Sequence, residues 1–201
     1  MTLTIIQGSN RENSESSRVA SFVSQNLNKI ITKETIDIID LNSMPLPLFN
    51  GKPEIENPNF IAIKNTLEQS DGFVLITPEW GGMASIAVKN LLQTFRNNQF
   101  GHKPALIISV SSGRGGAFPV AELRLNSFKN NHLCFIPEQV IIRDVNNLVL
   151  KYDDQELGKT EIFIRNRIDY CLKVLVEYTK ALILVRNSGV IDFEKFGNGM
   201  S

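Results

Sequence analysis

The sequence predicts an α/β fold in which one parallel sheet of five strands is covered by helices on both faces. Short apolar runs alternate along the chain with segments whose apolar residues recur at helical spacing. Two runs, residues 73–77 and 105–109, are apolar almost throughout, as in strands that are buried on both faces. No repeat or clear linker interrupts this pattern. We therefore expect one domain over residues 1–188 and a C-terminal tail over residues 189–201.

The strands are expected where branched apolar residues cluster between polar loops. The first run follows the N-terminal Met1, and the second contains Ile36, Ile38 and Ile39. The last run is short and is bounded by polar residues. The expected strands are residues 3–7, 36–40, 73–77, 105–109 and 139–143.

The helices are expected where apolar residues recur every three or four positions. The first begins near Ser16 and continues to Ile30, and the second begins after Pro58. The remaining three are expected at residues 86–95, 120–129 and 159–184. A proline-rich loop is expected at residues 44–49. Residues 192–201 are expected either to be loosely ordered or to cover a neighbouring subunit.

The composition excludes several classes of protein. The chain has 21 basic and 21 acidic residues, so its net charge of zero gives no clustered basic excess for a nucleic-acid partner. No apolar run is long enough to span a bilayer, and no signal peptide is recognisable. Cys134 and Cys171 form no CxxC motif and are expected to be free thiols in a reducing compartment. We expect a cytoplasmic protein without a membrane or nucleic-acid partner.

The loop after the first strand has the features of a phosphate site. It joins a strand to the start of a helix, where the first backbone amides lack internal partners and carry partial positive charge. Arg11 adds a cation whose fork geometry suits phosphate. Hydroxyl donors come from Ser9, Ser14, Ser16 and Ser17.

Common nucleotide motifs and side-chain catalytic sets are missing. The loop has no Gly-Lys-Ser/Thr ending and no GxGxxG, so Asp40 is not expected to bind a ribose. No acidic pair of a receiver domain follows the first strand. The sequence also offers no Ser/His/Asp set and no metal-ligand spacing. The two histidines, His102 and His132, are expected at the surface.

Two further loops are expected to meet the first one. They occupy residues 77–82 and 111–116, after the third and fourth strands. With a strand order of 2-1-3-4-5 these loops are neighbours at the carboxyl edge of the sheet, where open α/β sheets bind ligands. Gly81 and Gly82 would allow a flat ligand to come close. Trp80 is interpreted either as a contact to that ligand or as a core or subunit-contact aromatic.

Together the loops resemble the NAD(P)H-dependent FMN reductase family, a flavodoxin-like group that includes quinone, azo-dye and chromate reductases. The first family motif, GSxRxxSxS, is matched at Gly8, Ser9, Arg11, Ser14 and Ser16. The second, PEYNxxxPxxLKN, is matched at Pro78, Glu79, Lys89 and Asn90. The third, a Ser/Gly loop, is matched at Ser112, Gly113, Gly115 and Gly116, and a Leu-Arg pair follows at Leu123 and Arg124.

The resemblance implies a flavodoxin-like three-layer sandwich that binds FMN, with NADPH or NADH as the electron donor. The flavin carries the chemistry, so no catalytic side chain is expected. The implied phosphate ligands are Ser9, Arg11, Ser14 and Ser16. The implied neighbours of the isoalloxazine ring are Pro78, Glu79, Trp80 and Gly81 on one side and Ser112, Gly113 and Gly116 on the other. The chain is expected to pass hydride from nicotinamide to FMN and then to a small acceptor such as a flavin, quinone or azo compound.

Four positions depart from the family pattern. Trp80 replaces the usual Tyr, Gly81 replaces Asn, Ser85 stands where Pro is usual, and Gln93 stands where Asp often follows. Lys89 and Asn90 are interpreted either as family site residues or as residues that cap and pack the helix.

Two other functions are compatible with these residues. The chain could be a flavodoxin-like electron carrier, although zero net charge does not suit the usual acidic carrier. It could also be a flavin-binding sensor without nicotinamide turnover. By resemblance, a homodimer or homotetramer is expected, with helix 86–95 at the interface. Its apolar residues Ile86, Ala87, Leu91 and Leu92 could serve either the core or a partner.

Overall fold

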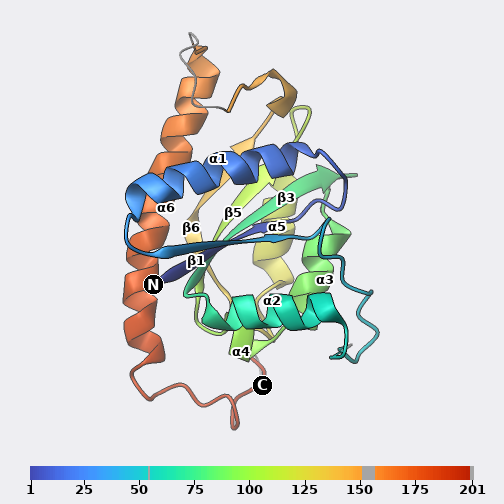
Figure 1. Cartoon of the computed structure of the whole chain (residues 1–201), viewed down its shortest axis with the longest axis vertical. Coiled ribbons are helices and arrows are strands. Elements are labelled where there is room, and N and C mark those ends of the chain that lie inside the picture. Colours follow the sequence, from blue (N-terminus) through green and yellow to red (C-terminus); the bar gives the residue numbers. More distant parts are fainter. Residues whose placement is uncertain (54, 151–156, 200–201) are drawn as a thin grey trace.

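A computed structural model describes residues 1–53, 55–150 and 157–199. Its five parallel strands lie in the order β2-β1-β3-β5-β6, which confirms the predicted sheet and the 2-1-3-4-5 order of its parallel strands (Figure 1). A short strand, β4, pairs antiparallel with β3 and was not predicted. The strands are β1 (Thr2–Gln7), β2 (Thr35–Asp40), β3 (Gly72–Trp80), β4 (Met83–Ala84), β5 (Pro104–Val110) and β6 (Cys134–Ile142).

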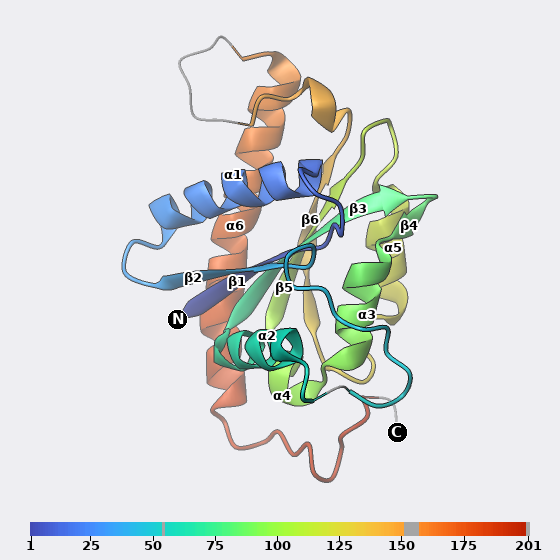
Figure 2. The same ribbon diagram turned by 45° about the vertical axis from the view of Figure 1, so that its right-hand side comes forward.

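Helices cover both faces of the sheet, which confirms the three-layer sandwich (Figure 2). One face packs against α1 (Glu15–Ile30) and α6 (Lys159–Arg186). The opposite face packs against α2 (Pro58–Gln69), α3 (Ile86–Thr94) and α5 (Ala117–Asn126). Two short helices, α4 (Asn97–Phe100) and the 3-10 turn η1 (Val145–Asn147), were not predicted.

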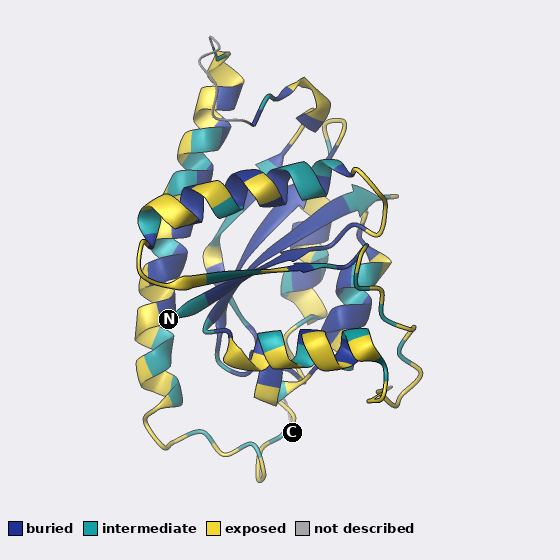
Figure 3. Ribbon diagram, in the orientation of Figure 1, coloured by how far each residue is buried: buried dark blue, intermediate teal, exposed yellow. Residues whose placement is uncertain are grey.

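The uniformly apolar central strands follow from these two cores. In β3, Val74 and Ile76 point to the α1/α6 core, whereas Phe73 and Leu75 point to the opposite core. Because successive side chains of a strand alternate between faces, a strand that is covered on both sides needs apolar residues at every position. Figure 3 shows these central strands as the buried layer of the molecule.

Strand β6 begins at Cys134, before the predicted start at residue 139. The first half of the strand was not predicted because it pairs irregularly with β5 and contains a proline. Its pairing with β5 shifts register between Ala105 and Ile107, and Pro137 lies in the extra length. An edge strand tolerates such a proline because one side of it forms no ladder. The Arg124 guanidinium donates hydrogen bonds to the carbonyls of Ile136 (2.5 Å) and Pro137 (3.2 Å), which braces the irregular stretch.

The C-terminal tail packs on the body, so the expectation of loose order is wrong for its described residues, which end at residue 199. The Phe193 ring stacks on His102, with centroids 5.7 Å apart, and meets His132 edge-on at 5.1 Å. The Gly199 amide donates to the Lys129 carbonyl at 2.8 Å. Both histidines are therefore half-buried beneath the tail rather than freely exposed at the surface.

Helix α6 is fixed at both of its ends. Near its start, the Glu161 carboxylate accepts hydrogen bonds at 2.8 Å from the amides of Val149 and Leu150. At its end, Arg186 forms an ion pair with Asp71 at 2.7 Å. The segment that follows β6 and contains Val149 is also bound to α1, because Arg18 of that helix donates to the carbonyls of residues 145, 148 and 149. No helix in the described ranges combines the length and apolarity needed to cross a membrane.

A buried lysine from outside helix α2 caps the C-terminus of that helix. Lys103 Nζ donates to the carbonyls of Leu67 (2.7 Å) and Glu68 (3.2 Å), which are orphan acceptors at the helix C-terminus. Burial, reinforced by the nearby Arg186, lowers the pKa of Lys103 from 10.5 to about 8, although Asp71 and Glu68 oppose that shift. In the folded protein this ammonium therefore loses its proton at a lower pH than in the unfolded chain.

We expect the free energy of unfolding to rise between pH 8 and pH 10.5 through Lys103, because in that window the unfolded chain binds the extra proton. The contribution is complete above the unfolded pKa and is lost as the pH falls through the folded pKa. Its size is on the order of 3 kcal/mol. Urea unfolding of wild type and Lys103→Met across this window measures it. Equal pH slopes in the two proteins would contradict the assignment.

Candidate cofactor-binding site

The three predicted loops meet around Gly8. Its amide donates to the Ile76 carbonyl at 2.8 Å, and its carbonyl accepts from Ser85 Oγ at 2.6 Å. A Cβ at this position would lie 2.2 Å from Val88 Cγ2 and 2.5 Å from the Ile76 oxygen. Only glycine therefore allows β1, β3 and the start of α3 to approach this closely.

The first loop is shaped by its own side chains. Ser14 is the N-cap of α1, and its Oγ accepts from the Ser17 amide at 3.2 Å. Ser9 Oγ accepts from the Arg11 amide at 3.2 Å, and the Ser9 amide donates to the Gln7 side chain. Each of these hydroxyls acts as an acceptor within the loop and retains its own hydrogen for a ligand. Gln7 was not predicted to shape the site.

The same loop leaves donors without acceptors. Ser16 Oγ is buried and has no hydrogen-bond partner in the part of the chain that the structure describes. In that same part, the amides of Glu12, Asn13, Glu15 and Ser16 also have no acceptor. Several unpaired donors at a helix N-terminus are what a phosphate group requires. The loop therefore fits the phosphate of FMN.

The second loop, which was expected simply to follow the third strand, is a β-hairpin. β3 continues to Trp80 and pairs with β4 through Glu79–Ala84 and Trp80–Met83. Gly81 (φ 58°) and Gly82 (φ 77°) form its two-residue turn, in which both positions need positive φ. Asn also tolerates this conformation, so Gly81 in its place keeps the turn and removes only a side-chain amide.

Trp80 connects the first loop to this hairpin. The Arg11 guanidinium carbon lies 5.5 Å from the centroid of the Trp80 ring, within the range of a cation–π contact. The ring is half-buried and belongs to neither hydrophobic core. Arg11 itself is exposed. The core interpretation of Trp80 is therefore wrong, and the ring lies at the carboxyl edge with the predicted site residues.

Glu79 joins the hairpin to the third loop. Its Oε2 accepts from the Gly116 amide at 2.6 Å, and a Cβ on Gly115 would lie only 1.7 Å from that oxygen. Pro78 is buried directly before it, whereas Ser112 and Gly113 are exposed. Nearby, Ser109 Oγ is buried without a partner among the described residues, a feature that the sequence did not reveal.

The departures at Ser85, within the second motif, and at Gln93, just after it, have different consequences. Ser85 caps α3 by accepting from the Val88 amide at 3.2 Å, and its φ of −59° is the angle that proline would fix. Serine therefore suits the backbone angle that proline would fix at this position. It also adds the hydroxyl that donates to the Gly8 carbonyl. Gln93 is exposed, and no contact explains its replacement of the usual Asp.

Lys89 and Asn90 have structural roles. Lys89 Nζ lies 3.0 Å from Glu122 Oε1, and the other carboxylate oxygen accepts from the Ala84 amide at 2.7 Å, which braces the hairpin. Burial alone would raise the pKa of Glu122, but these two donors outweigh it and lower the pKa. Asn90 holds the proline-rich loop through the Phe49 amide at 2.8 Å and the Pro47 carbonyl at 2.9 Å.

Sequence reasoning did not identify Gln7, Thr77, Ser109 and Glu122. Thr77 Oγ1 accepts from the Ser85 amide at 3.1 Å, so it also supports the junction at Gly8. Polar residues within otherwise apolar strands were the available signal for Gln7, Thr77 and Ser109. Within the described ranges, no group of three or more His, Cys, Asp or Glu side chains could hold a metal ion.

Comparisons with known proteins agree with this architecture. A curated NADPH azoreductase from Bacillus sp. strain OY1-2 is 28% identical over 79% of this chain and 83% of its own length. An oxidoreductase from Corynebacterium diphtheriae superimposes with a TM-score of 0.72, covering 90% of this chain and 97% of that one at 14% identity. The FerB flavoenzyme of Paracoccus denitrificans gives 0.60, covering 88% and 98% at 19% identity. At these identities the two structures support the fold alone.

The family model described as NADPH-dependent FMN reductase matches residues 1–147, which include all three loops. Membership implies an oxidoreductase that uses FMN and NAD(P)H. The chain belongs to the NADPH-dependent FMN reductase family.

Proposed function

We propose that this protein binds FMN across the three loops around Gly8 and reduces a small flat acceptor with electrons from NAD(P)H. The observation that carries the proposal is the buried Ser16 hydroxyl without a partner, among unpaired amides at the start of α1. A phosphate oxygen would satisfy these donors, since a buried hydroxyl without a partner is costly. Loop amides, Ser9, Ser14, Ser16, Ser17 and Arg11 would hold that phosphate.

The hairpin and the third loop would hold the ring. The Gly81-Gly82 turn and Trp80 would offer one side, and the exposed backbone of Ser112 and Gly113 would offer the other. The Glu79–Gly116 hydrogen bond fixes the distance between these two sides. Amide donors of the third loop would stabilise negative charge on the bound ring. FMN, when bound, accepts a hydride from NAD(P)H and passes the electron pair to the acceptor.

The acceptor class is proposed from the relatives. The azoreductase named above supports an azo compound, and the family resemblance also includes quinones and flavins. Azo compounds, quinones and flavins are all flat and conjugated. They could therefore stack on the isoalloxazine face once the oxidised nicotinamide has dissociated from it. An electron carrier that does not use nicotinamide is the alternative, and the next experiment separates the two functions.

We expect anaerobic NADPH or NADH to bleach the visible flavin absorbance of the FMN-loaded protein rapidly. The measurement is stopped-flow absorbance, followed by addition of an azo dye or quinone to restore the oxidised spectrum. Free FMN with the same nucleotide is the control. A bound flavin that neither nucleotide reduces would contradict the reductase and favour a carrier or a sensor.

Arg11→Ala tests the phosphate assignment. Because this side chain is exposed and forms no ion pair with a described residue, its loss should change the free energy of unfolding by less than about 1 kcal/mol. FMN affinity should fall about tenfold or more, since a charge-assisted contact is lost. Fluorescence titration with FMN measures the affinity, with Arg96→Ala as a matched exposed arginine. Equal FMN affinity in wild type and Arg11→Ala would remove Arg11 from the site.

We also propose a homodimer or homotetramer that uses the start of α3. Leu91 and Leu92 are buried in the core, whereas Ile86 is 65% exposed, and the neighbouring Met83 and Phe118 are 52% and 69% exposed. Light scattering after size-exclusion chromatography measures the mass. Ile86→Glu with Phe118→Glu should shift an oligomer to monomer, and a monomeric wild type would oppose the proposal.

We propose a cytoplasmic location because the two cysteines are not joined in a disulfide. Cys134 and Cys171 are both free thiols in the structure, and burial raises the pKa of Cys171 to about 11. Free thiols of this kind persist in reducing compartments. Subcellular fractionation tests the location, and recovery outside the cytoplasm would overturn it.

A further inference from the structure

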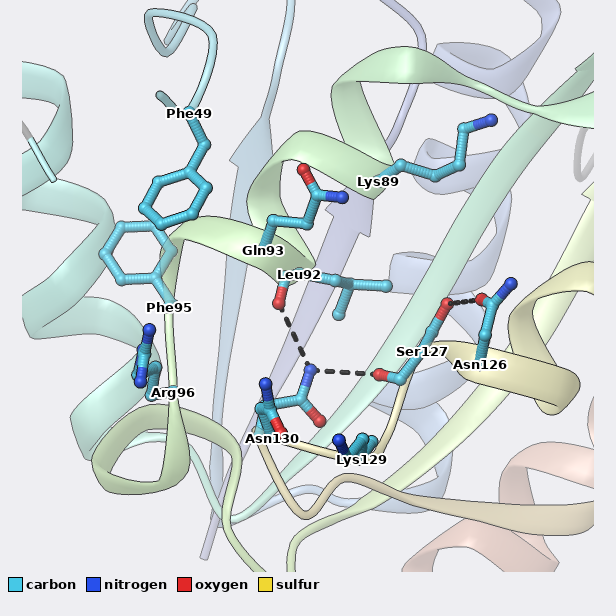
Figure 4. Close-up of a pocket in the computed structure, with 11 residues that line it drawn as sticks. Phe49, Lys89, Leu92, Gln93, Phe95, Arg96, Asn126, Ser127, Lys129 and Asn130 are labelled. Carbon is cyan, nitrogen blue, oxygen red and sulfur yellow. Dashed lines mark hydrogen bonds between the residues drawn. The ribbon is translucent and has the colours of Figure 1, made fainter. Parts of the chain in front are cut away.

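A second cavity lies apart from the three loops. It has a volume of about 490 Å³ and lies between α3, the end of α5 and the turn that follows α5 (Figure 4). None of the predicted FMN-binding residues lines it. A ligand of this cavity would therefore bind at a different place from the FMN proposed at the three loops.

The cavity is rich in positive charge although the chain as a whole is neutral. Lys89, Arg96 and Lys129 line it, and no Asp or Glu does. Lys89 is neutralised by Glu122, but Arg96 and Lys129 form no ion pair within the described ranges. Two exposed cations beside a hollow attract an anion more strongly than they would on a flat surface, because the low-dielectric walls focus their field.

One end of the cavity is aromatic. The rings of Phe49 and Phe95 line that end (Figure 4). Phe95 is held in the core by stacking on Phe60, with centroids 4.9 Å apart, and the Phe49 backbone is held by Asn90 at 2.8 Å. The Phe95 ring is thus a buried part of the core, and Phe49 offers the accessible aromatic surface at this end of the cavity. The bond from Asn90 fixes the Phe49 backbone before any ligand arrives, which limits the entropy that binding would cost.

The floor of the cavity is also fixed. Asn131 is buried, and its Nδ2 donates to the carbonyls of Ser127 (2.9 Å) and Leu92 (3.3 Å). These bonds tie the turn after α5 to α3. The hollow between the two helices is therefore a built feature of the fold.

We propose that this cavity binds a small aromatic anion, a carboxylate or sulfonate, with the ring against Phe49 and the charge beside Arg96 and Lys129. Aromatic walls with a few placed charges are typical of sites for such ligands. The guanidinium of Arg96 can bind two oxygens of a carboxylate or sulfonate at once. This binding does not require FMN, so its success and that of the proposed function are separate.

The test uses naphthalenesulfonate as the probe and isothermal titration calorimetry as the readout, with and without saturating FMN. We expect one site per chain in both conditions. Arg96→Gln with Lys129→Gln should weaken binding about tenfold or more, since two charge contacts are lost. Neutral naphthol should bind wild type and this double variant equally. Both substituted side chains are exposed, so the variant is expected to fold.

The matched control is Lys173→Gln with Lys180→Gln, which makes the same charge change on the exposed face of α6. It should leave naphthalenesulfonate binding unchanged. The proposal is overturned by any of three results: no binding to wild type, equal affinity in wild type and the Arg96/Lys129 variant, or complete displacement of the probe by FMN. The last result would place the probe in the flavin loops.

Discussion

The close approach at Gly8 is the constraint on which the site depends. A single missing Cβ lets the end of β1 reach the backbone of β3 and the side chain of Val88 at the same time. The hydroxyl of Ser85 then ties α3 to the same carbonyl. Three segments that are distant in sequence are thereby joined at one residue, so the first loop and the hairpin have a defined separation before any ligand binds.

Charged side chains connect the neighbouring loops to this junction at Gly8. Glu79 holds the third loop, and Glu122 with Lys89 holds the short strand β4. Each carboxylate accepts from a backbone amide that would otherwise lack a partner, so its charge fixes loop geometry. Two of the residues that the family motifs share, Glu79 and Lys89, thus shape the site through protein contacts of their own. The surface proposed to face the flavin consists mainly of backbone and of Trp80.

The sheet and the three loops could be predicted because their signals are local. Buried runs such as residues 73–77 need no knowledge of their partners, and serines or glycines after a strand mark a turn wherever they occur. The start of β6 could not be predicted, because Pro137 fits there only through an edge position and a brace from Arg124. The Glu79–Gly116 bond, the Arg11–Trp80 contact and the packing of Phe193 between two histidines join residues far apart in the chain. No periodicity encodes such pairings.

Helix α6 lies wholly beyond the 147 residues that the family model matches, yet it packs with α1 on one face of the sheet. Its Ile168, Leu172 and Leu175 are fully buried against the core that also contains Val74 and Ile76. A chain cut where the family match ends would expose that apolar surface to water. The limit of sequence similarity is therefore not a limit of the folding unit. Excision or fusion of this protein for engineering needs to retain the chain through Arg186, whose ion pair with Asp71 ends the helix.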